Sequence, residues 1–293
     1  MKLPPLSTLS NLSSIPKNLG AAMAKYTPHQ QRLITGLCLV VALVLLLAAG
    51  GWLLRLAAVL VACAGMHELL AMFWPGETRT RSKNLGLVLA GLIVLSQAFG
   101  GQATLAVSCM AFWAVAMTFL FDYGRGNTEA RLEHYAPIAF GLLYIPMVLQ
   151  FALYFSPPEQ CLVILAAIAS DVGGYYAGNL FGKRKLWPLV SPKKTWEGLA
   201  GGLLLCVVVC ASLGYCGAKA GWPLPAWPVA GWILVALLLH QAALFGDFFE
   251  SALKRGLNVK DSGTLLPGHG GILDRIDSIL FCVAMYALLR AFF

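Results

Sequence analysis

The sequence predicts an all-α protein, a polytopic bundle of about nine transmembrane helices with its N-terminus in the cytoplasm. Of its 293 residues, 59% are apolar and 12% are charged, and the mean hydropathy is +0.74. Soluble globular proteins have roughly 45–50% apolar and about 25% charged residues, so this chain has too little polar surface to cover a core in water. The same composition excludes a disordered chain and a nucleic-acid-binding domain, and it makes the lipid bilayer an expected partner.

Nine apolar runs approach the length of about 20 helical residues that crosses a hydrocarbon core of about 30 Å. They do not alternate apolar and polar residues as the strands of a membrane barrel do. The runs cover 33–50, 54–74, 85–100, 103–121, 136–155, 160–181, 199–218, 226–246 and 276–292. The short turns at 50–53 and 100–102 leave open whether each joins two full spans or lies in a hairpin.

The distribution of Lys and Arg predicts the orientation, because cytoplasmic loops of membrane proteins are enriched in these residues. With the N-terminus inside, 18 of the 21 cations lie in cytoplasmic segments. The opposite face has only Arg55, Lys219 and Arg290. An odd number of helices then puts Phe293 outside, and adding or removing one helix would break the alternation.

The chain divides into three predicted parts. Residues 1–31 are basic and rich in Ser and Pro, which indicates a flexible cytoplasmic tail rather than a cleaved signal peptide. Residues 32–155 form N-terminal transmembrane helices, and 156–293 form a candidate catalytic region with cytoplasmic loops at 182–198 and 247–275. The eight cysteines lie in or beside apolar runs without a CxxC pair, and Cys206 and Cys210, four residues apart in an apolar helix, are expected to pack as small apolar residues.

Acidic residues gather in the two cytoplasmic stretches 181–202 and 246–277, which together hold six of the 13 acids and nine of the 21 cations. The positive-inside tendency accounts for the cations but not for the acids. The acids are therefore the first indication of a functional site.

The spacing of these acids suggests two clusters. Asp247, Glu250 and Ser251 share one face if the eighth helix continues through them, and Asp274 and Asp277 are three residues apart at the start of the ninth. Convergence of both clusters on Mg²⁺ is one interpretation, because Mg²⁺ takes one or two carboxylates together with substrate phosphate and water. Carboxylates stabilised at helix ends are the alternative.

One aspartate and one glutamate fall inside apolar runs. Asp171 lies in the sixth run, where insertion of an aspartate costs about 2.5–3.5 kcal/mol. Gly174, Gly178 and Gly182 follow it at intervals of four, which predicts a close helix contact and turns Asp171 toward the bundle interior. A purely structural polar contact is the alternative. Glu68, in the second run, has no companion motif, and a structural and an accessory role remain equally open.

A glycine-rich turn precedes the ninth helix. Gly270 and Gly271 leave room for backbone N–H groups to approach an anion near a helix N-terminus, although a plain turn would have the same composition. His269 could bridge a phosphate, transfer a proton or complete the turn. Clustered cations, carboxylates and glycine turns together are typical of proteins that handle phosphates with a metal. A transporter would instead have polar groups at the membrane midplane and inverted repeats, and the sequence has no such repeat.

The stretch 246–277 resembles the signature of the phosphatidate cytidylyltransferase (CDP-diacylglycerol synthase) family. Further blocks at 171–175, 181–183 and 191–198 are similar to the same family, so the resemblance covers about 170–278, and only Gly174 and Asn179 depart from it, where the family pattern has Ala and Arg. The matching residues are Gly246, Asp247, Glu250, Ser251, Leu253, Lys254, Arg255, Lys260, Asp261, Gly263, Leu266, Pro267, His269, Gly270, Gly271, Ile272, Asp274, Arg275, Ile276 and Asp277.

The resemblance implies that CTP and phosphatidate react to CDP-diacylglycerol and pyrophosphate, with Mg²⁺ and a second, monovalent cation such as K⁺ as cofactors. It implies Asp247 and Asp274 as the principal metal ligands and Asp277 and Asp171 as the next candidates. The implied catalytic residues are Asp247, Asp274, Asp277, Lys254, Arg275 and His269. The implied substrate-binding residues are Lys193, Lys194, Ser251, Arg255, Lys260, Asp261, Gly270 and Gly271.

The implied chemistry needs no enzyme nucleophile, because an oxygen of the lipid phosphate attacks the α-phosphorus of CTP. Two unit charges 4 Å apart repel each other by about 4 kcal/mol at an effective dielectric constant near 20, so the site has to neutralise two polyanions. The alternatives are a CTP-dependent polyprenol kinase, an ether-lipid cytidylyltransferase, and a non-catalytic transporter or scaffold. The resemblance also makes a homodimer plausible, and the compact chain suggests a bacterial inner membrane with the active site facing the cytoplasm.

Overall fold

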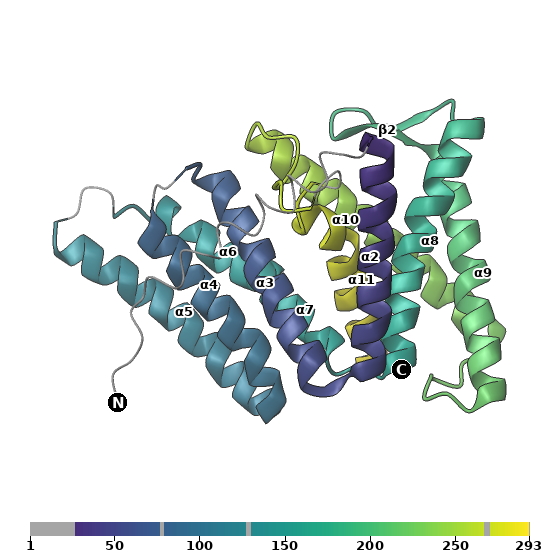
Figure 1. The fold of residues 1–293 in the computed structure, drawn as a ribbon, viewed down its shortest axis with the longest axis horizontal. Helices are drawn as coiled ribbons and strands as arrows, with labels where there is room; N and C mark the ends of the chain where they lie inside the picture. The colour runs from purple at the N-terminus through teal and green to yellow at the C-terminus, as the bar shows by residue number, and fades with distance from the viewer. Residues whose placement is uncertain (1–26, 77–78, 127–129, 267–269, 293) are drawn as a thin grey trace.

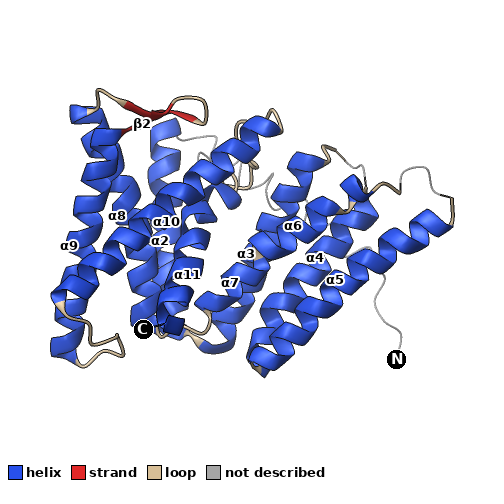
Figure 2. Cartoon of the chain, turned by 180° about the vertical axis from the view of Figure 1, so that it is seen from behind, coloured by secondary structure: helices blue, strands red, loops and turns tan. Residues whose placement is uncertain are grey.

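The computed structural model describes the chain except residues 1–26, 77–78, 127–129, 267–269 and 293, and it is an all-helical bundle with one small β-hairpin (Figures 1 and 2). The first part comprises α2 (Pro28–Ala49), α3 (Gly51–Phe73), α4 (Thr80–Ser96), the 3₁₀ helices η2 (Gln97–Phe99) and η3 (Leu132–His134), α5 (Gly101–Gly124), α6 (Ala136–Tyr144) and α7 (Pro146–Ala152). The second part comprises α8 (Pro157–Phe181), the antiparallel strands β1 (Lys185–Trp187) and β2 (Ser191–Thr195), α9 (Trp196–Ala220), α10 (Val229–Gly256) and α11 (Leu273–Phe292).

Within the described residues, seven helical segments are long and apolar enough to cross a membrane, which confirms a polytopic helical membrane protein. They are Gly51–Phe73, Thr80–Phe99, Gly101–Gly124, Leu132–Ala152, Pro157–Phe181, Trp196–Ala220 and Val229–Gly256. The first and last predicted runs are also helical, but α2 has a shorter apolar stretch (Ile34–Ala49) and α11 is not among the seven. The count of nine spans and the orientation stay predictions.

One expected boundary near the N-terminus differs in the structure, and the two turns left open by the sequence each join separate helices. The tail was expected to extend to residue 31, but α2 already begins at Pro28, because Thr27 and Gln30 form a reciprocal capping box at its start. The turn near residue 50 is tight and joins two separate helices, with Gly50 at a φ of 57°. The turn near residue 100 is similar, with Gly100 at a φ of 95°.

The predicted fifth run is divided into α6 and α7. The break lies at Ile145 and Pro146, where the proline has no N–H to donate to the preceding turn and becomes the first residue of α7. This break bends the segment within the core, where Ile145 is fully buried.

The apolar core of the second part lies between α8, α9, α10 and α11. Its members include Leu162, Leu239 and Tyr286, and Cys206, Cys210 and Cys282 are buried among them. All eight cysteines are free thiols, and these three pack as small apolar residues, as the sequence predicted for Cys206 and Cys210.

Helices α8 and α9 approach each other through glycines, as the spacing of small residues predicted. A Cβ atom added to Gly173 would lie 2.6 Å from the carbonyl oxygen of Gly201, and one added to Gly202 would lie 2.6 Å from that of Ser170. Because these neighbours are backbone atoms, the contact leaves no room for a side chain.

Replacing Gly173 by alanine should therefore destabilise the protein by about 1–3 kcal/mol, since the added methyl group overpacks the interface between α8 and α9. Thermal unfolding in detergent measures this effect. Gly101→Ala is the matched control, because a Cβ atom there meets nothing within 4 Å. Equal melting temperatures for the two variants would contradict the proposed packing.

Candidate functional site

The two stretches that carry the predicted site meet at one end of the bundle. Figure 1 shows the hairpin of β1 and β2 above the C-terminal end of α8 and the start of α9, at the same end as the connection from α10 to α11. Neither stretch is the simple loop expected from the sequence. Residues 185–195 form the hairpin, α10 continues to Gly256, and α11 already begins at Leu273.

The continuation of α10 places Asp247, Glu250, Ser251 and Lys254 on one helical face, as their spacing predicted. The Ser251 hydroxyl donates a hydrogen bond to Oδ1 of Asp247 at 3.1 Å, and Lys254 Nζ lies 3.3 Å from a carboxylate oxygen of Glu250. The helix is uninterrupted here because no glycine or proline lies between Gly246 and Gly256.

A cavity of about 350 Å³ opens between α8, α9, α10 and the hairpin. Four predicted site residues line it, namely Asp171, Lys193, Lys194 and Asp247. Asp171 thus borders the cavity and its side chain is exposed there. Tyr175, Asn179, Leu186, Thr195 and Leu244 are among the other lining residues, so the walls combine aromatic, aliphatic and polar groups.

The hairpin is fixed to α10 by one ion pair and two aromatic contacts. Lys194 Nζ lies 2.6 Å from Oδ2 of Asp247 and 5.1 Å from the ring centre of Phe248. Trp187 packs edge-on against the same ring, with 5.6 Å between ring centres. These contacts hold the basic strand over the acidic face of α10.

His240 also lines the cavity, and the sequence reasoning missed it. Its side chain is 2% exposed, and its Nδ1 lies 2.8 Å from the hydroxyl of Ser170. His240 could have been found from its spacing, because it is a polar residue in an apolar run, seven positions before Asp247. A separation of seven places both residues on the same helical face.

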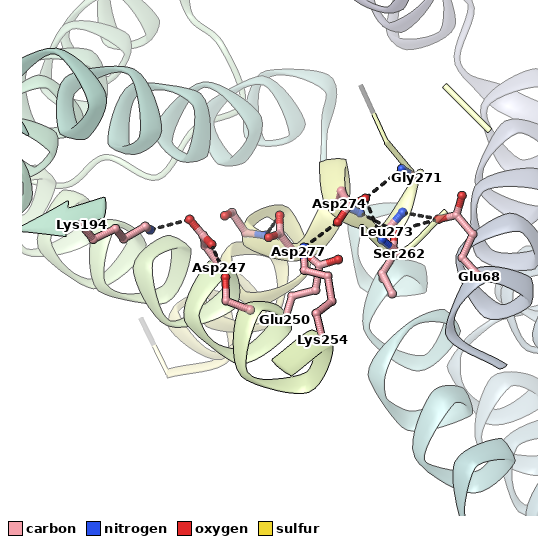
Figure 3. Close-up of polar contacts among 12 residues, drawn as sticks. Glu68, Lys194, Asp247, Glu250, Lys254, Ser262, Gly271, Leu273, Asp274 and Asp277 are labelled. Carbon is pink, nitrogen blue, oxygen red and sulfur yellow. Dashed lines mark hydrogen bonds and ion pairs between the residues drawn. The ribbon is translucent and has the colours of Figure 1, made fainter. Parts of the chain in front are cut away.

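A second group of charges surrounds Asp274 (Figure 3). Its Oδ1 accepts a hydrogen bond from Lys254 Nζ at 2.6 Å, and its Oδ2 accepts from the backbone N–H groups of Ser262 at 3.0 Å and Gly271 at 2.8 Å. Asp274 therefore connects α10, the segment before α11, and α11 itself.

Glu68 reaches the same region from α3. Its carboxylate accepts hydrogen bonds from the backbone N–H groups of Ile272 at 3.0 Å and Leu273 at 2.8 Å, and from the hydroxyl of Ser262 at 3.3 Å. The sequence left the role of Glu68 open, because its partners lie about 200 residues further along the chain.

These contacts occupy the backbone N–H groups at the start of α11. Gly271 donates to Asp274, Ile272 and Leu273 donate to Glu68, and Asp274 donates to the Ser262 hydroxyl at 3.3 Å. A substrate phosphate would have to displace carboxylates of the chain here. The expected phosphate contacts of Gly270 and Gly271 thus remain predictions, and His269 lies outside the described residues.

The other predicted residues surround this region at the surface. Arg255, Lys260, Asp261 and Arg275 are exposed near the connection from α10 to α11, whereas Asp277 is 8% exposed and lies beside Glu250. The exposed cations lie outside the cavity that Lys193 and Lys194 line.

The described residues contain no assembled group of three or more His, Cys, Asp or Glu side chains that could hold a metal ion. The donors nevertheless suit a hard cation. Glu250 is 1% exposed, and its Oε1 finds no hydrogen-bond partner in the described part of the chain, although Asp277 lies beside it. Both principal ligands that the resemblance implies, Asp247 and Asp274, already hold a lysine ammonium group at 2.6 Å. Carboxylate oxygens of this kind fit Mg²⁺, which takes its remaining ligands from phosphate and water.

Comparison with known proteins agrees with the signature. The sequence profile of the cytidylyltransferase family matches residues 30–293. The phosphatidate cytidylyltransferase of Bacillus subtilis is 31% identical over 281 residues, which cover 90% of this chain and 98% of the relative. That of Helicobacter pylori is 32% identical, with coverage of 89% and 92%, and that of Mycobacterium bovis is 37% identical over 188 residues, with coverage of 62% and 59%. The chain therefore belongs to the cytidylyltransferase family.

Proposed function

We propose that this protein transfers the cytidylyl group of CTP to phosphatidate and so forms CDP-diacylglycerol and pyrophosphate. The observation that carries the proposal is the cavity that brings Lys193 and Lys194 next to Asp171 and Asp247 at the end of long apolar helices. A soluble nucleotide and a membrane-embedded lipid headgroup can meet at such a place. The names of the relatives in Bacillus subtilis and Helicobacter pylori support this choice of substrates.

The distribution of charge supports a site that faces the cytoplasm of a bacterial inner membrane. The stretches 181–202 and 246–277 contain nine of the 11 cations of residues 156–293, at the end of the bundle where α2 begins (Figure 1). Because cytoplasmic segments are enriched in Lys and Arg, this end is the cytoplasmic one. The product would then be released where phospholipid synthesis continues.

The site contains several carboxylates that fit a divalent cation. Five carboxylates gather there with four cationic side chains, namely Asp171, Asp247, Glu250, Asp274 and Asp277 with Lys193, Lys194, Lys254 and Arg275. Asp247, Asp274, Asp277 and Asp171 would hold Mg²⁺, which would neutralise phosphate charge and stabilise the leaving pyrophosphate. A monovalent cation such as K⁺ would share the same carboxylates.

The lysines of the site have different proposed roles. Lys193 and Lys194 would bind the phosphates of the substrates within the cavity, because they are the cations that line it. Lys254 instead lies between Glu250 and Asp274, so it keeps these carboxylates in place. The aromatic and aliphatic walls of the cavity would exclude water from the reacting phosphates.

The reaction is a direct displacement. An oxygen of the lipid phosphate forms a bond to the α-phosphorus of CTP while the bond from that phosphorus to the bridging oxygen breaks, and pyrophosphate leaves with the electron pair. The lipid phosphate oxygen is itself the nucleophile, so no serine of the chain has to form a covalent intermediate.

The purified protein should convert labelled CTP and phosphatidate to CDP-diacylglycerol when Mg²⁺ is present, and removal of Mg²⁺ with a chelator should stop the reaction. Thin-layer chromatography of the extracted lipids detects the product. A labelled lipid formed only with polyprenol would instead indicate a polyprenol kinase. Formation of no labelled lipid from any of these substrates would favour a transporter or scaffold.

Asp247→Asn and Asp274→Asn should each lower kcat by roughly 10²-fold or more while the protein still inserts and folds, because each change removes a charge from the proposed cation site. Asp122→Asn is the matched control, since Asp122 bonds to Tyr135 in a different part of the bundle. Initial rates in detergent, with melting temperatures measured in parallel, test the prediction. Near-normal turnover of either site variant would remove that aspartate from the site.

A direct displacement inverts the configuration at phosphorus. CTP with a chiral phosphorothioate at the α-position should therefore give a product of inverted configuration, which phosphorus NMR of the product can establish. Retention would require a covalent intermediate on the enzyme and would contradict the proposed mechanism.

A further inference from the structure

We propose that Glu68 of α3 is a positioning residue for this site, and that its carboxylate fixes the start of α11 and so holds Asp274 and Asp277 in place. The inference rests on the proposed function only where it predicts a change in turnover. Glu68 lies outside the signature, in the part of the bundle that contains no recognised motif. Even so, it holds residues of the signature in position.

The Glu68 side chain is buried, and both of its carboxylate oxygens are used in hydrogen bonds within the protein. The side chain is 5% exposed and lies five residues before the end of α3, a helix that is mostly apolar. Both of its oxygens accept hydrogen bonds, Oε1 from Ile272 N–H and Oε2 from Leu273 N–H and the Ser262 hydroxyl (Figure 3). A carboxylate at this position compensates the unpaired N–H groups and the positive end of the dipole of α11.

At two glycines of the signature a side chain would not fit, because Glu68 fills the space. A Cβ atom on Gly263 would lie 2.5 Å from Oε1 of Glu68 and 2.7 Å from its Cδ. A Cβ atom on Gly271 would lie 2.7 Å from the same Cδ and would also collide with the Ser262 hydroxyl. The segment before α11 is thus shaped around the carboxylate of α3.

A short series of hydrogen bonds connects Glu68 to Asp274. The hydroxyl of Ser262 donates to Glu68 and accepts from the backbone N–H of Asp274, while the backbone N–H of Ser262 donates to the Asp274 carboxylate. One turn before Glu68 in α3, a Cβ atom on Gly65 would lie 3.6 Å from Ile276, so the backbone of α3 also lies close to α11. Displacing Glu68 would therefore release the first turn of α11, which contains Asp274 and precedes Asp277.

Glu68 also restricts where a substrate can bind. Its carboxylate takes the backbone N–H groups that would otherwise attract a phosphate to the start of α11. Phosphates are consequently directed to Lys193 and Lys194, which line the cavity beside Asp247. Glu68 should for this reason affect turnover and cation binding more than it affects substrate affinity.

The test compares Glu68→Gln with Glu159→Gln in the full-length protein. Glutamine keeps the shape of Glu68, but its amide nitrogen faces an N–H donor and cannot accept from it. Glu159 is the matched control, because it is 4% exposed and accepts from the Ser156 N–H at 2.6 Å at the start of α8, in a separate hydrogen-bond network with Tyr286. For both variants we would measure kcat, the KM values for CTP and phosphatidate, the melting temperature, and the binding of Mn²⁺ without substrate by electron paramagnetic resonance.

Glu68→Gln should lower kcat and weaken Mn²⁺ binding by about tenfold or more, with both KM values within about threefold of the wild type. Glu159→Gln should keep wild-type kcat and Mn²⁺ affinity even where its melting temperature falls. Wild-type kcat and Mn²⁺ affinity in Glu68→Gln would overturn the inference, whatever the melting temperature. If Glu68→Gln does not fold, Glu68→Asp, which keeps the charge on a shorter side chain, is judged by the same criteria.

The same experiment separates this inference from the proposed function. A wild-type protein that binds Mn²⁺ but forms no CDP-diacylglycerol would defeat the proposed function, and the Mn²⁺ affinities of the variants would still decide the role of Glu68. A wild-type protein that forms the product, with an equally active Glu68→Gln variant, would defeat the role of Glu68 alone.

Discussion

The carboxylate of Asp274 ties three segments of the chain together through one ion pair and two hydrogen bonds. It binds the Lys254 ammonium group of α10 and two backbone N–H groups of the segment before α11, while its own backbone begins α11. A carboxylate that loses such partners in a partly buried place leaves polar groups unsatisfied, at a cost of about 1–3 kcal/mol for each group. The positions of Lys254, Glu250 and Asp277 all depend on this connection, because each lies on a helix that Asp274 secures.

The cavity depends on a second constraint, the close approach of α8 and α9. Glycines at their interface bring the two backbones together, and the hairpin that connects the helices then projects over α10. Lys194 meets Asp247 there, so a basic strand and an acidic helix face form opposite walls of one space. Cationic side chains and carboxylate oxygens therefore lie within the same small volume.

The sequence predicted the features that depend on local spacing. The helical class, the shared face of Asp247 and Ser251, and the glycine contact beside Asp171 all follow from periods of three, four and seven residues. The hairpin was missed because its strands are only three and five residues long and lie in a lysine-rich stretch that also reads as a positive-inside loop. Glu68 and His240 could not be assigned, because a lone polar residue in an apolar helix gives no indication of a partner on another helix.

Because α3 provides the cap of α11, the C-terminal part of the chain depends on the N-terminal part. The motif-bearing part of the chain begins near residue 170, yet the first backbone N–H groups of α11 find their acceptor on Glu68. A fragment that starts there would expose these donors within an apolar bundle and would leave empty the space around Gly263 and Gly271. The motifs all lie in the C-terminal part, which suggests that it could be expressed alone or exchanged between homologues. Its dependence on Glu68 of the N-terminal part argues against both. Grafting the signature onto another membrane scaffold would require a carboxylate at the position of Glu68 as well.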